Sequence, residues 1–229
     1  MPDPKVLVGC AINEAYEYCL EPFITSVKTL TYQNYDTLFV ENSKTNRFLD
    51  KLKEKSLNVI KCDWNENARE RIVQSRNMLR DYVINKNYDW FLMLDQDVIP
   101  PRDVIEKLLA HKKRVICGIY YGIFQNKLKP VAWYWDAFND ANNTNMFQFD
   151  HRIVQSYKLV YGLFGLGCCL IHRSILGKVE FRYIKDMDSF EDTWFALDLK
   201  AKKIKIYADT SILCKHLLVG KFDWKNVLK

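Results

Sequence analysis

The chain has 229 residues, which is enough for one sizeable domain and short for two. Hydrophobic residues make up 48% of it and aromatic residues 14%, which excludes a wholly disordered chain. The net charge of +6 is spread along the sequence, so it favours a small anionic substrate over a nucleic-acid-binding protein.

The cysteines and the apolar stretches indicate where the protein works. Its seven cysteines are an odd number with no Cys-x-x-Cys pair, which favours buried free thiols over a disulfide or zinc framework. The first residues lack a secretory signal pattern, and the longest apolar stretches, residues 115–124 and 161–171, are too short to span a bilayer. We therefore expect a cytoplasmic protein.

Strand and helix patterns alternate through the first half of the chain. In chain order, the sequence predicts a strand at 5–12, a helix at 16–30, a strand at 37–40, a helix at 46–55, a strand at 58–62, a helix at 68–85, a strand at 89–94, a helix at 103–111 and a strand at 115–121. Pro100 and Pro101 suit the start of the helix at 103–111. Repeated strand–helix–strand units imply an α/β fold with a mostly parallel sheet.

The second half has a different character. The predicted elements are a strand at 130–135, a polar loop at 139–145, a hairpin or flap from 147–149 and 153–157, a glycine-punctuated segment at 162–171 that runs into a buried strand, a helix at 191–201 and a last strand at 205–207. These patterns predict a smaller, mixed β portion that follows the alternating half.

Two aspartates follow an apolar strand. The run at 89–94 reads as a strand buried on both faces, and Asp95 and Asp97 directly after it point to the same side of an extended chain. Ligands bind beyond the carboxyl ends of such strands in open α/β sheets. Because two carboxylates repel each other, a divalent cation with diphosphate oxygens as co-ligands is the natural occupant. The alternative is that these aspartates cap the following helix.

A second pair of acids and a histidine lie near the end of the sequence. Glu191 and Asp192 open the helix at 191–201, where they either complement the helix dipole or supply a catalytic base. His216 follows Cys214, but no second pair completes a zinc site. Beside Asp97, a neutral imidazole suits Mn²⁺; the alternative is an ordinary surface or core histidine.

Other candidate residues have ordinary alternatives. Arg69, Arg76 and Arg80 share a helix face; Arg76 lies near the apolar stripe and needs an anionic partner, whereas we expect the other two to be solvated. Glu41 ends the second strand and either accepts from a base or ribose or is a loop acid. A set of aromatic residues forms either a stacking platform for a sugar or part of the core: Tyr120, Tyr121, Trp133, Tyr134 and Trp135.

Six short motifs occur in a fixed order. They are Val-Glu-Asn-Ser at 40–43, Ser-Arg-Asn at 75–77, Leu-Asp-Gln-Asp at 94–97 with Pro-Pro at 100–101, the glycine-rich segment 165–171, Phe-Glu-Asp-Thr-Trp-Phe at 190–195 and Cys-Lys-His at 214–216. Together they resemble the GT-A glycosyltransferases, in particular the family 2 nucleotide-sugar transferases, from residue 5 to about residue 216.

The resemblance implies a single Rossmann-like GT-A domain over 1–229. It would consist of a nucleotide-binding half at 1–124, an acceptor and catalytic half at 125–216 and a tail at 217–229. The implied activity moves a sugar from a UDP- or GDP-sugar to the hydroxyl of a glycan, lipid-linked or protein acceptor, with Mn²⁺ or Mg²⁺ as cofactor.

The resemblance also implies roles for individual residues. Asp95, Asp97 and His216 would hold the metal, and Asp192 would be the general base of an inverting displacement, with Glu191 orienting sugar hydroxyls. The residues implied at the donor are Ala11, Asn13, Glu41, Arg76, Asp95, Gln96 and Gly167. Glu41 stands where the family usually has aspartate, which leaves the identity of the base open.

Three other interpretations remain at this point. An inactive GT-A-like binding module is disfavoured because both acidic pairs and His216 are present, and a sugar-phosphate nucleotidyltransferase would carry a glycine-rich basic loop where this chain has residues 9–14. No nucleic-acid partner is expected. For the basic tail at 217–229, packing or a lid is favoured over peripheral contact with a membrane.

Overall fold

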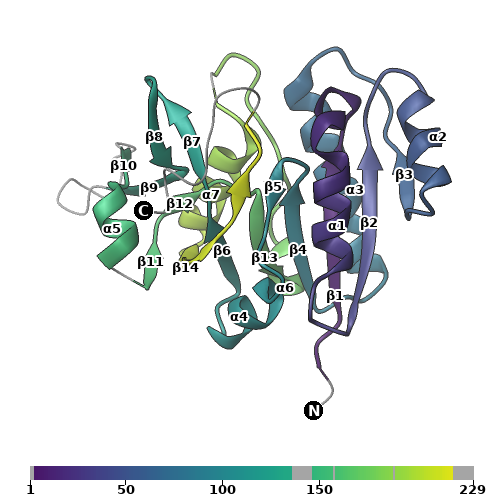
Figure 1. Cartoon of the computed structure of the whole chain (residues 1–229). Helices are drawn as coiled ribbons and strands as arrows, with labels where there is room; N and C mark the ends of the chain where they lie inside the picture. The colour runs from purple at the N-terminus through teal and green to yellow at the C-terminus, as the bar shows by residue number, and fades with distance from the viewer. Residues whose placement is uncertain (1–2, 136–145, 157, 188, 219–229) are drawn as a thin grey trace.

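The computed structural model describes residues 3–135, 146–156, 158–187 and 189–218. Its centre is an eight-stranded sheet (Figure 1). In spatial order the strands are β11 (Leu159–Tyr161), β14 (Tyr207–Leu213), β6 (Val115–Ile119), β13 (Cys168–His172), β4 (Trp90–Asp95), β1 (Val6–Ile12), β2 (Tyr35–Glu41) and β3 (Val59–Lys61). Strands from both halves of the chain therefore share one sheet.

The sheet is mixed. The block β4-β1-β2-β3 is parallel, as is the pair β14-β6. In contrast, β13 runs antiparallel to both β4 and β6, and β11 runs antiparallel to β14. The predicted parallel sheet is confirmed for the first half, whereas the second half inserts a reversed strand at the centre.

Three small sheets surround the large one. The ribbon pairs β5 (Val98–Ile99) with β15 (Lys215–His216), and the hairpin pairs β7 (Tyr121–Phe124) with β8 (Lys127–Pro130). A three-stranded sheet consists of β10 (Met146–Gln148), β9 (Ala132–Trp135) and β12 (Leu163–Phe164).

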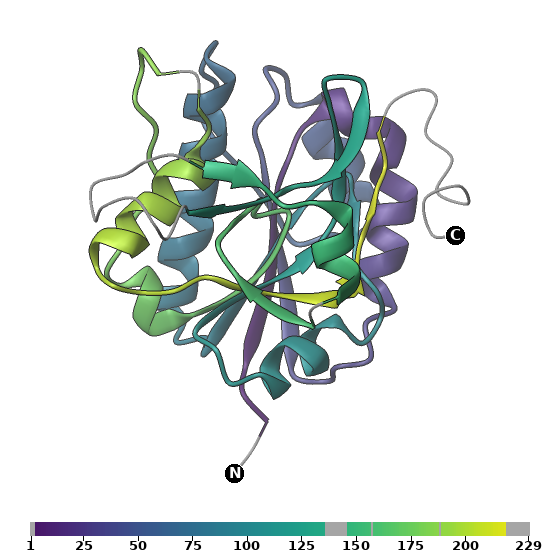
Figure 2. The ribbon, with the colours of Figure 1, turned by 90° about the vertical axis from the view of Figure 1, so that its left-hand side faces the viewer.

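Helices cover both faces of the large sheet. They are η1 (Glu14–Cys19), α1 (Leu20–Lys28), α2 (Arg47–Glu54), α3 (Ala68–Asn85), α4 (Val104–Ala110), α5 (His151–Ser156), α6 (Arg173–Leu176) and α7 (Glu191–Ala201). The two views together show α1 on one face and α3 and α7 on the other (Figures 1 and 2). None of the helices among the described residues is long and apolar enough to cross a membrane.

Two hydrophobic clusters sandwich the sheet, one on each face. Along β4, Phe91 and Met93 face the cluster that contains α3, α6 and α7, while Leu92 and Leu94 face the cluster that contains α1 and α4. All four are at most 1% exposed. The prediction that this strand is apolar on both faces is confirmed, and its end is consequently held rigidly. All seven cysteines are free and buried, as predicted.

Several predicted elements differ from the structure. The helix predicted at 16–30 begins as the 3₁₀ helix η1, and α1 starts only at Leu20. Pro22 explains the late start, because it has no N–H for an α-helical hydrogen bond and is tolerated only in the first turn of a helix. Residues 153–156, predicted as part of a hairpin or flap, instead belong to helix α5. There, Asp150 Oδ1 accepts from the N–H of Arg152 at 2.8 Å and caps the helix start.

Two further boundaries shift. The strand predicted at 115–121 breaks at Tyr120, after which β7 leaves the large sheet to pair with β8. The strand predicted at 205–207 corresponds to β14, which starts at Tyr207 and extends to Leu213. The predicted polar loop at 139–145 lies outside the described residues.

Candidate active site

A cavity of about 720 Å³ opens where β1, β2 and β4 end. Its polar lining includes Asn13, Asn42, Asp95, Asp97 and His216. Parallel strands deliver their carboxyl ends to the same edge of a sheet, which brings these residues together from distant parts of the sequence. The cavity therefore lies where the sequence predicted the site, beyond the carboxyl ends of the strands.

Gln96, between the two aspartates in the sequence, turns its side chain toward the backbone near the end of β1. Its side chain is 4% exposed, its Oε1 accepts from the N–H of Asn13 at 2.9 Å, and its Nε2 donates to the carbonyl of Tyr16 at 3.0 Å. The amide thus ties the end of β4 to the end of β1. Gln96 also lines the cavity, and both polar atoms of its amide are hydrogen-bonded to the protein backbone.

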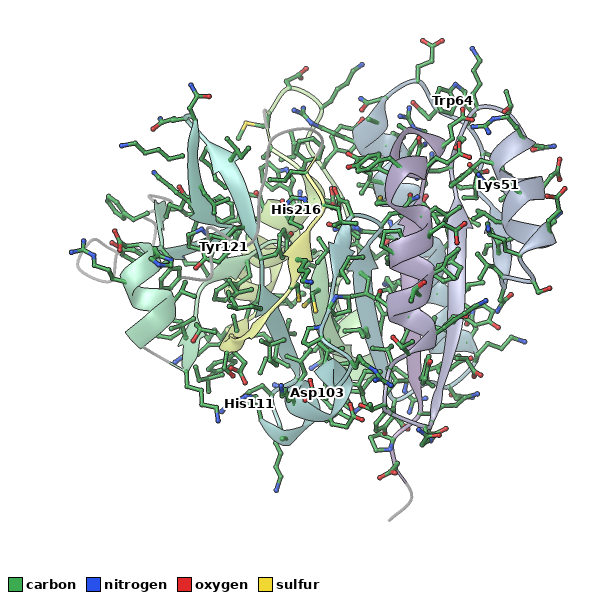
Figure 3. The ribbon with its side chains drawn as sticks, in the orientation of Figure 1. Lys51, Trp64, Asp103, His111, Tyr121 and His216 are labelled. Carbon is green, nitrogen blue, oxygen red and sulfur yellow. The ribbon has the colours of Figure 1, made fainter. Side chains whose placement is uncertain are left out.

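Asp97 and His216 meet through the small ribbon. Strands β5 and β15 place Val98 opposite His216, and His216 Nε2 lies 3.2 Å from Asp97 Oδ2. On the other side of the ring, Nδ1 lies 2.8 Å from the carbonyl oxygen of Tyr121, beside which Figure 3 shows His216. A carbonyl oxygen can only accept, so Nδ1 carries a hydrogen and donates it. In the neutral ring, the lone pair of Nε2 therefore faces the carboxylate side.

The protonation of His216 follows from this environment. Burial lowers the pKa of the imidazole, but the hydrogen bond and charge of Asp97 outweigh burial, so the pKa is raised above its ordinary value. Tyr120 packs edge-to-face on the ring at 5.3 Å between centroids and limits its motion. Asp97 and His216 thus form an oriented carboxylate–imidazole pair, which can bind a proton or a cation between its two groups.

Arg76 joins two acids that lie far apart in the sequence. It is 6% exposed, its Nη2 donates to Asp95 Oδ1 at 2.7 Å, and its Nη1 forms an ion pair with Glu191 Oε1. Burial raises the pKa of both carboxyl groups, and the positive charge of Arg76 opposes that rise. The predicted need of Arg76 for an anionic partner is met from within the protein.

Asp192 lies at the start of α7, on the wall of the cavity. Its Oδ1 accepts from the N–H of Thr193 at 2.6 Å, and within the described part of the chain no hydrogen bond uses Oδ2. Burial raises the pKa of this carboxyl above its ordinary value, with Arg76 opposing the rise. A carboxylate with a raised pKa in a cavity is a suitable general base, because its basicity lies closer to neutral pH.

The sequence of the chain matches a known family. The model described as glycosyl transferase family 2 matches residues 7–179, which is more than half of the 229 residues. The chain belongs to glycosyl transferase family 2. No curated protein matches it.

Solved structures of GT-A glycosyltransferases share the fold of this family 2 glycosyltransferase. GalNAc-T7 with UDP, GalNAc and Mn²⁺ has a TM-score of 0.69 at 13% identity, over 93% of this chain and 44% of that one. TarS 1-349 of S. aureus has a TM-score of 0.53 at 15% identity, over 95% and 58%. A197 from STIV has a TM-score of 0.52 at 16% identity, over 93% and 86%. The chain thus spans less than half of the GalNAc-T7 chain. At these sequence identities, the structural similarity shows only that the GT-A fold is shared.

Of the other residues predicted to bind the donor of this glycosyltransferase, two line the cavity and two do not. Ala11 and Asn13 line the cavity. Gly167 lies directly against Asp95: its carbonyl accepts from the N–H of Asp95 at 3.0 Å, and a Cβ atom on it would be 2.8 Å from Asp95 Oδ2. Glu41, in contrast, is fully buried outside the cavity lining. It binds Lys61 Nζ at 2.5 Å and accepts from the N–H of Ser43 at 2.7 Å.

The three predicted metal ligands do not form one cluster. Among the residues that the structure describes, no group of three or more His, Cys, Asp or Glu side chains surrounds a common point. The reason is that Asp95 turns toward Arg76, which leaves Asp97 and His216 as the closely placed pair.

Of the five aromatic residues considered as a sugar platform, Tyr120 lines the cavity. Tyr121 is buried, and Tyr134 stacks on Phe147 away from the cavity. Trp133 packs against Phe124, and the side chain of Trp135 lies outside the described part of the chain.

Sequence reasoning missed two polar residues of the site and misjudged one arginine. Asn42 is 3% exposed and links Asn13 to Ser75, at 2.7 and 3.0 Å; its place in the Val-Glu-Asn-Ser motif was the available signal. Arg71 also lines the cavity, and no pattern distinguished it. Arg80 was expected to be solvated, but its Nε donates to the carbonyl of Leu176 at the end of α6 and to that of Val179 after it.

Gly165 supports the site by allowing close packing, which gives a first testable expectation. A Cβ atom there would lie 2.1 Å from the Tyr120 hydroxyl oxygen and 2.7 Å from Val131 Cγ1. We expect Gly165→Ala to lower the free energy of unfolding by about 1–3 kcal/mol through overpacking. Urea denaturation measures this, with Gly177→Ala, whose Cβ would meet its nearest atom at 3.9 Å, as control. Equal stability of both variants would contradict the packing argument.

Proposed function

We propose that this protein transfers a sugar from a nucleoside diphosphate sugar to an acceptor hydroxyl, with inversion of the sugar carbon. Asp97 and His216 would bind a divalent cation, and Asp192 would be the general base. The observation that carries the proposal is that one cavity holds a carboxylate–imidazole pair and a separate carboxylate with a raised pKa. The first suits a cation on a leaving diphosphate, and the second suits removal of a proton from an acceptor.

The residues present fit a divalent cation. A carboxylate and an imidazole nitrogen are ligands of Mn²⁺, and a histidine that ligates a metal typically donates its other N–H to a backbone carbonyl, as His216 does to Tyr121. Asp97 Oδ2 and His216 Nε2 would hold Mn²⁺ or Mg²⁺ together with donor oxygens. When bound, the cation supplies Lewis-acid stabilisation of the leaving diphosphate. The Mn²⁺ and UDP in the related GalNAc-T7 structure support this choice.

The donor would occupy the polar part of the cavity. Asn13 and Asn42 line this part and are bonded to each other, and Arg71 adds a positive charge on the wall. Asp95 is fixed by Arg76 and would accept a hydrogen bond from a sugar or ribose hydroxyl. Glu41 would act indirectly, by fixing the backbone that follows β2 through its hydrogen bond from Ser43.

Asp192 would take the proton from the acceptor hydroxyl as that hydroxyl attacks the sugar. Glu191 would orient the sugar, since its Oε2 is buried without a hydrogen-bond partner among the described residues. The seven free thiols support a reducing compartment such as the cytoplasm.

Binding of nucleotide with metal tests the proposal. We expect UDP or GDP with Mn²⁺ at about 100 times its Kd to stabilise the protein by about 2.7 kcal/mol, which is roughly 5–10 °C in Tm. Asp97→Ala should lose the part of the shift that depends on Mn²⁺, because it removes one of the paired ligands. Asp63→Ala, an exposed acid outside the cavity lining, is the control. Absence of any metal-dependent shift with the tested nucleotides would overturn the proposal.

A further inference from the structure

One part of the cavity is apolar. Beyond the polar residues at the strand ends, its wall consists of Ile123, Phe124, Val131, Leu166 and Phe190. None of these side chains can donate or accept a hydrogen bond. Asp192 lines the same cavity two residues after Phe190, so the group we assign as the base lies next to this apolar wall.

The part of the apolar wall around Phe124 and Val131 is held by contacts within the protein. The N–H of Val131 donates to the carbonyl of Tyr120 at 2.9 Å, and the N–H of Gly165 donates to the carbonyl of Val131 at 3.1 Å. The ring of Phe124 packs edge-to-face on Trp133 at 5.7 Å between centroids. This part of the wall is therefore formed without an acceptor, as is typical of ligand sites.

Large apolar side chains are exposed around the same mouth. Ile123 on β7 is 56% exposed, Phe190 before α7 is 47% exposed and Tyr16 in η1 is 44% exposed, and all three line the cavity. They come from three separate segments of the chain. Exposed apolar groups that gather at one place mark a surface that a partner covers.

We propose that the acceptor carries an apolar, lipid-like group next to its attacking hydroxyl, and that the apolar wall holds this group. The inference rests on the proposed function, because a single displacement requires the acceptor hydroxyl to lie beside Asp192. A chain of sugars would bring many hydroxyls against side chains that cannot pair with them, which disfavours its binding.

A matched pair of probes tests the inference. We would measure the affinity of methyl β-D-glucoside and of octyl β-D-glucoside, the latter below its micelle concentration, by calorimetry on the whole chain with and without UDP and Mn²⁺. We expect the octyl probe to bind at least about tenfold more tightly, a change that burial of about two methylene groups would give.

Two double variants localise the effect. Ile123→Ser with Phe190→Ser should remove the preference for the octyl probe. Phe147→Ser with Tyr161→Ser should retain it, because these residues are equally exposed, at 47% and 54%, but do not line the cavity. Equal affinity of the two probes, or an octyl preference that survives the first double variant, would overturn the inference. The nucleotide-dependent Tm shift in the same proteins reports the proposed function separately.

Discussion

Arg76→Met is expected to lower the free energy of unfolding by about 3–5 kcal/mol at neutral pH. Arg76 is buried between Asp95 and Glu191, so removing its charge leaves two carboxylates without a counter-ion in a poorly hydrated environment. Urea denaturation measures the loss. Arg182→Met is the matched control: it breaks an exposed ion pair with Asp198 and is expected to cost at most about 1 kcal/mol.

The pH dependence of this loss has a defined sign. Burial already raises the pKa of Asp95 and Glu191 in the folded protein, and removal of Arg76 raises it further. A carboxyl whose folded pKa lies above its unfolded pKa destabilises the protein as pH rises through the folded value. The deficit of Arg76→Met should therefore shrink as pH falls from 7 toward 4. A deficit independent of pH would show that Arg76 acts through packing rather than charge.

Asp192→Asn is expected to reduce the rate of sugar transfer by about 10²–10⁴-fold while nucleotide binding stays unchanged. The amide keeps the shape of the side chain and the hydrogen bond from Thr193, but it cannot accept a proton at neutral pH. Steady-state transfer assays measure the rate, and the Tm shift with UDP and Mn²⁺ measures donor binding. Asp198→Asn, on the same helix and paired with Arg182, should transfer at the normal rate.

The same variant should be more stable than the natural protein at neutral pH. Because burial raises the folded pKa of Asp192, its ionisation destabilises the native state above that pKa, and asparagine removes this cost. The gain should disappear below about pH 4, where the carboxyl is protonated in both states. Full activity in Asp192→Asn would remove this residue from the mechanism, whatever its effect on stability.

Local patterns predicted the elements that carry their own signals. The helix bounds 68–85 and 191–201 agree with α3 and α7 to the residue, because Asn67 caps the first and acidic residues open the second. The strand that ends in Asp95 is apolar on both faces, which indicates a central position. These features depend on neighbours within a few positions of the sequence.

The partners of the charged groups depend on contacts that no local pattern contains. The sequence allows Asp95 either to share a cation with Asp97 or to form an ion pair with Arg76. Which of the two forms depends on how α3 packs against the end of β4. Glu41 looked available for a ligand, yet β3 places Lys61 directly opposite it in the sheet register, so its carboxylate is already neutralised. Sequence reasoning predicted a site at the ends of the strands, where the structure has the cavity, but left the pairing of its charges open.

The ribbon of β5 and β15 also determines when the site becomes complete during synthesis. It joins Asp97 to His216, which are 119 positions apart, so Asp97 is synthesised well before its imidazole partner. Until then, the nascent protein has Asp97 without its imidazole and could not hold a cation between the two.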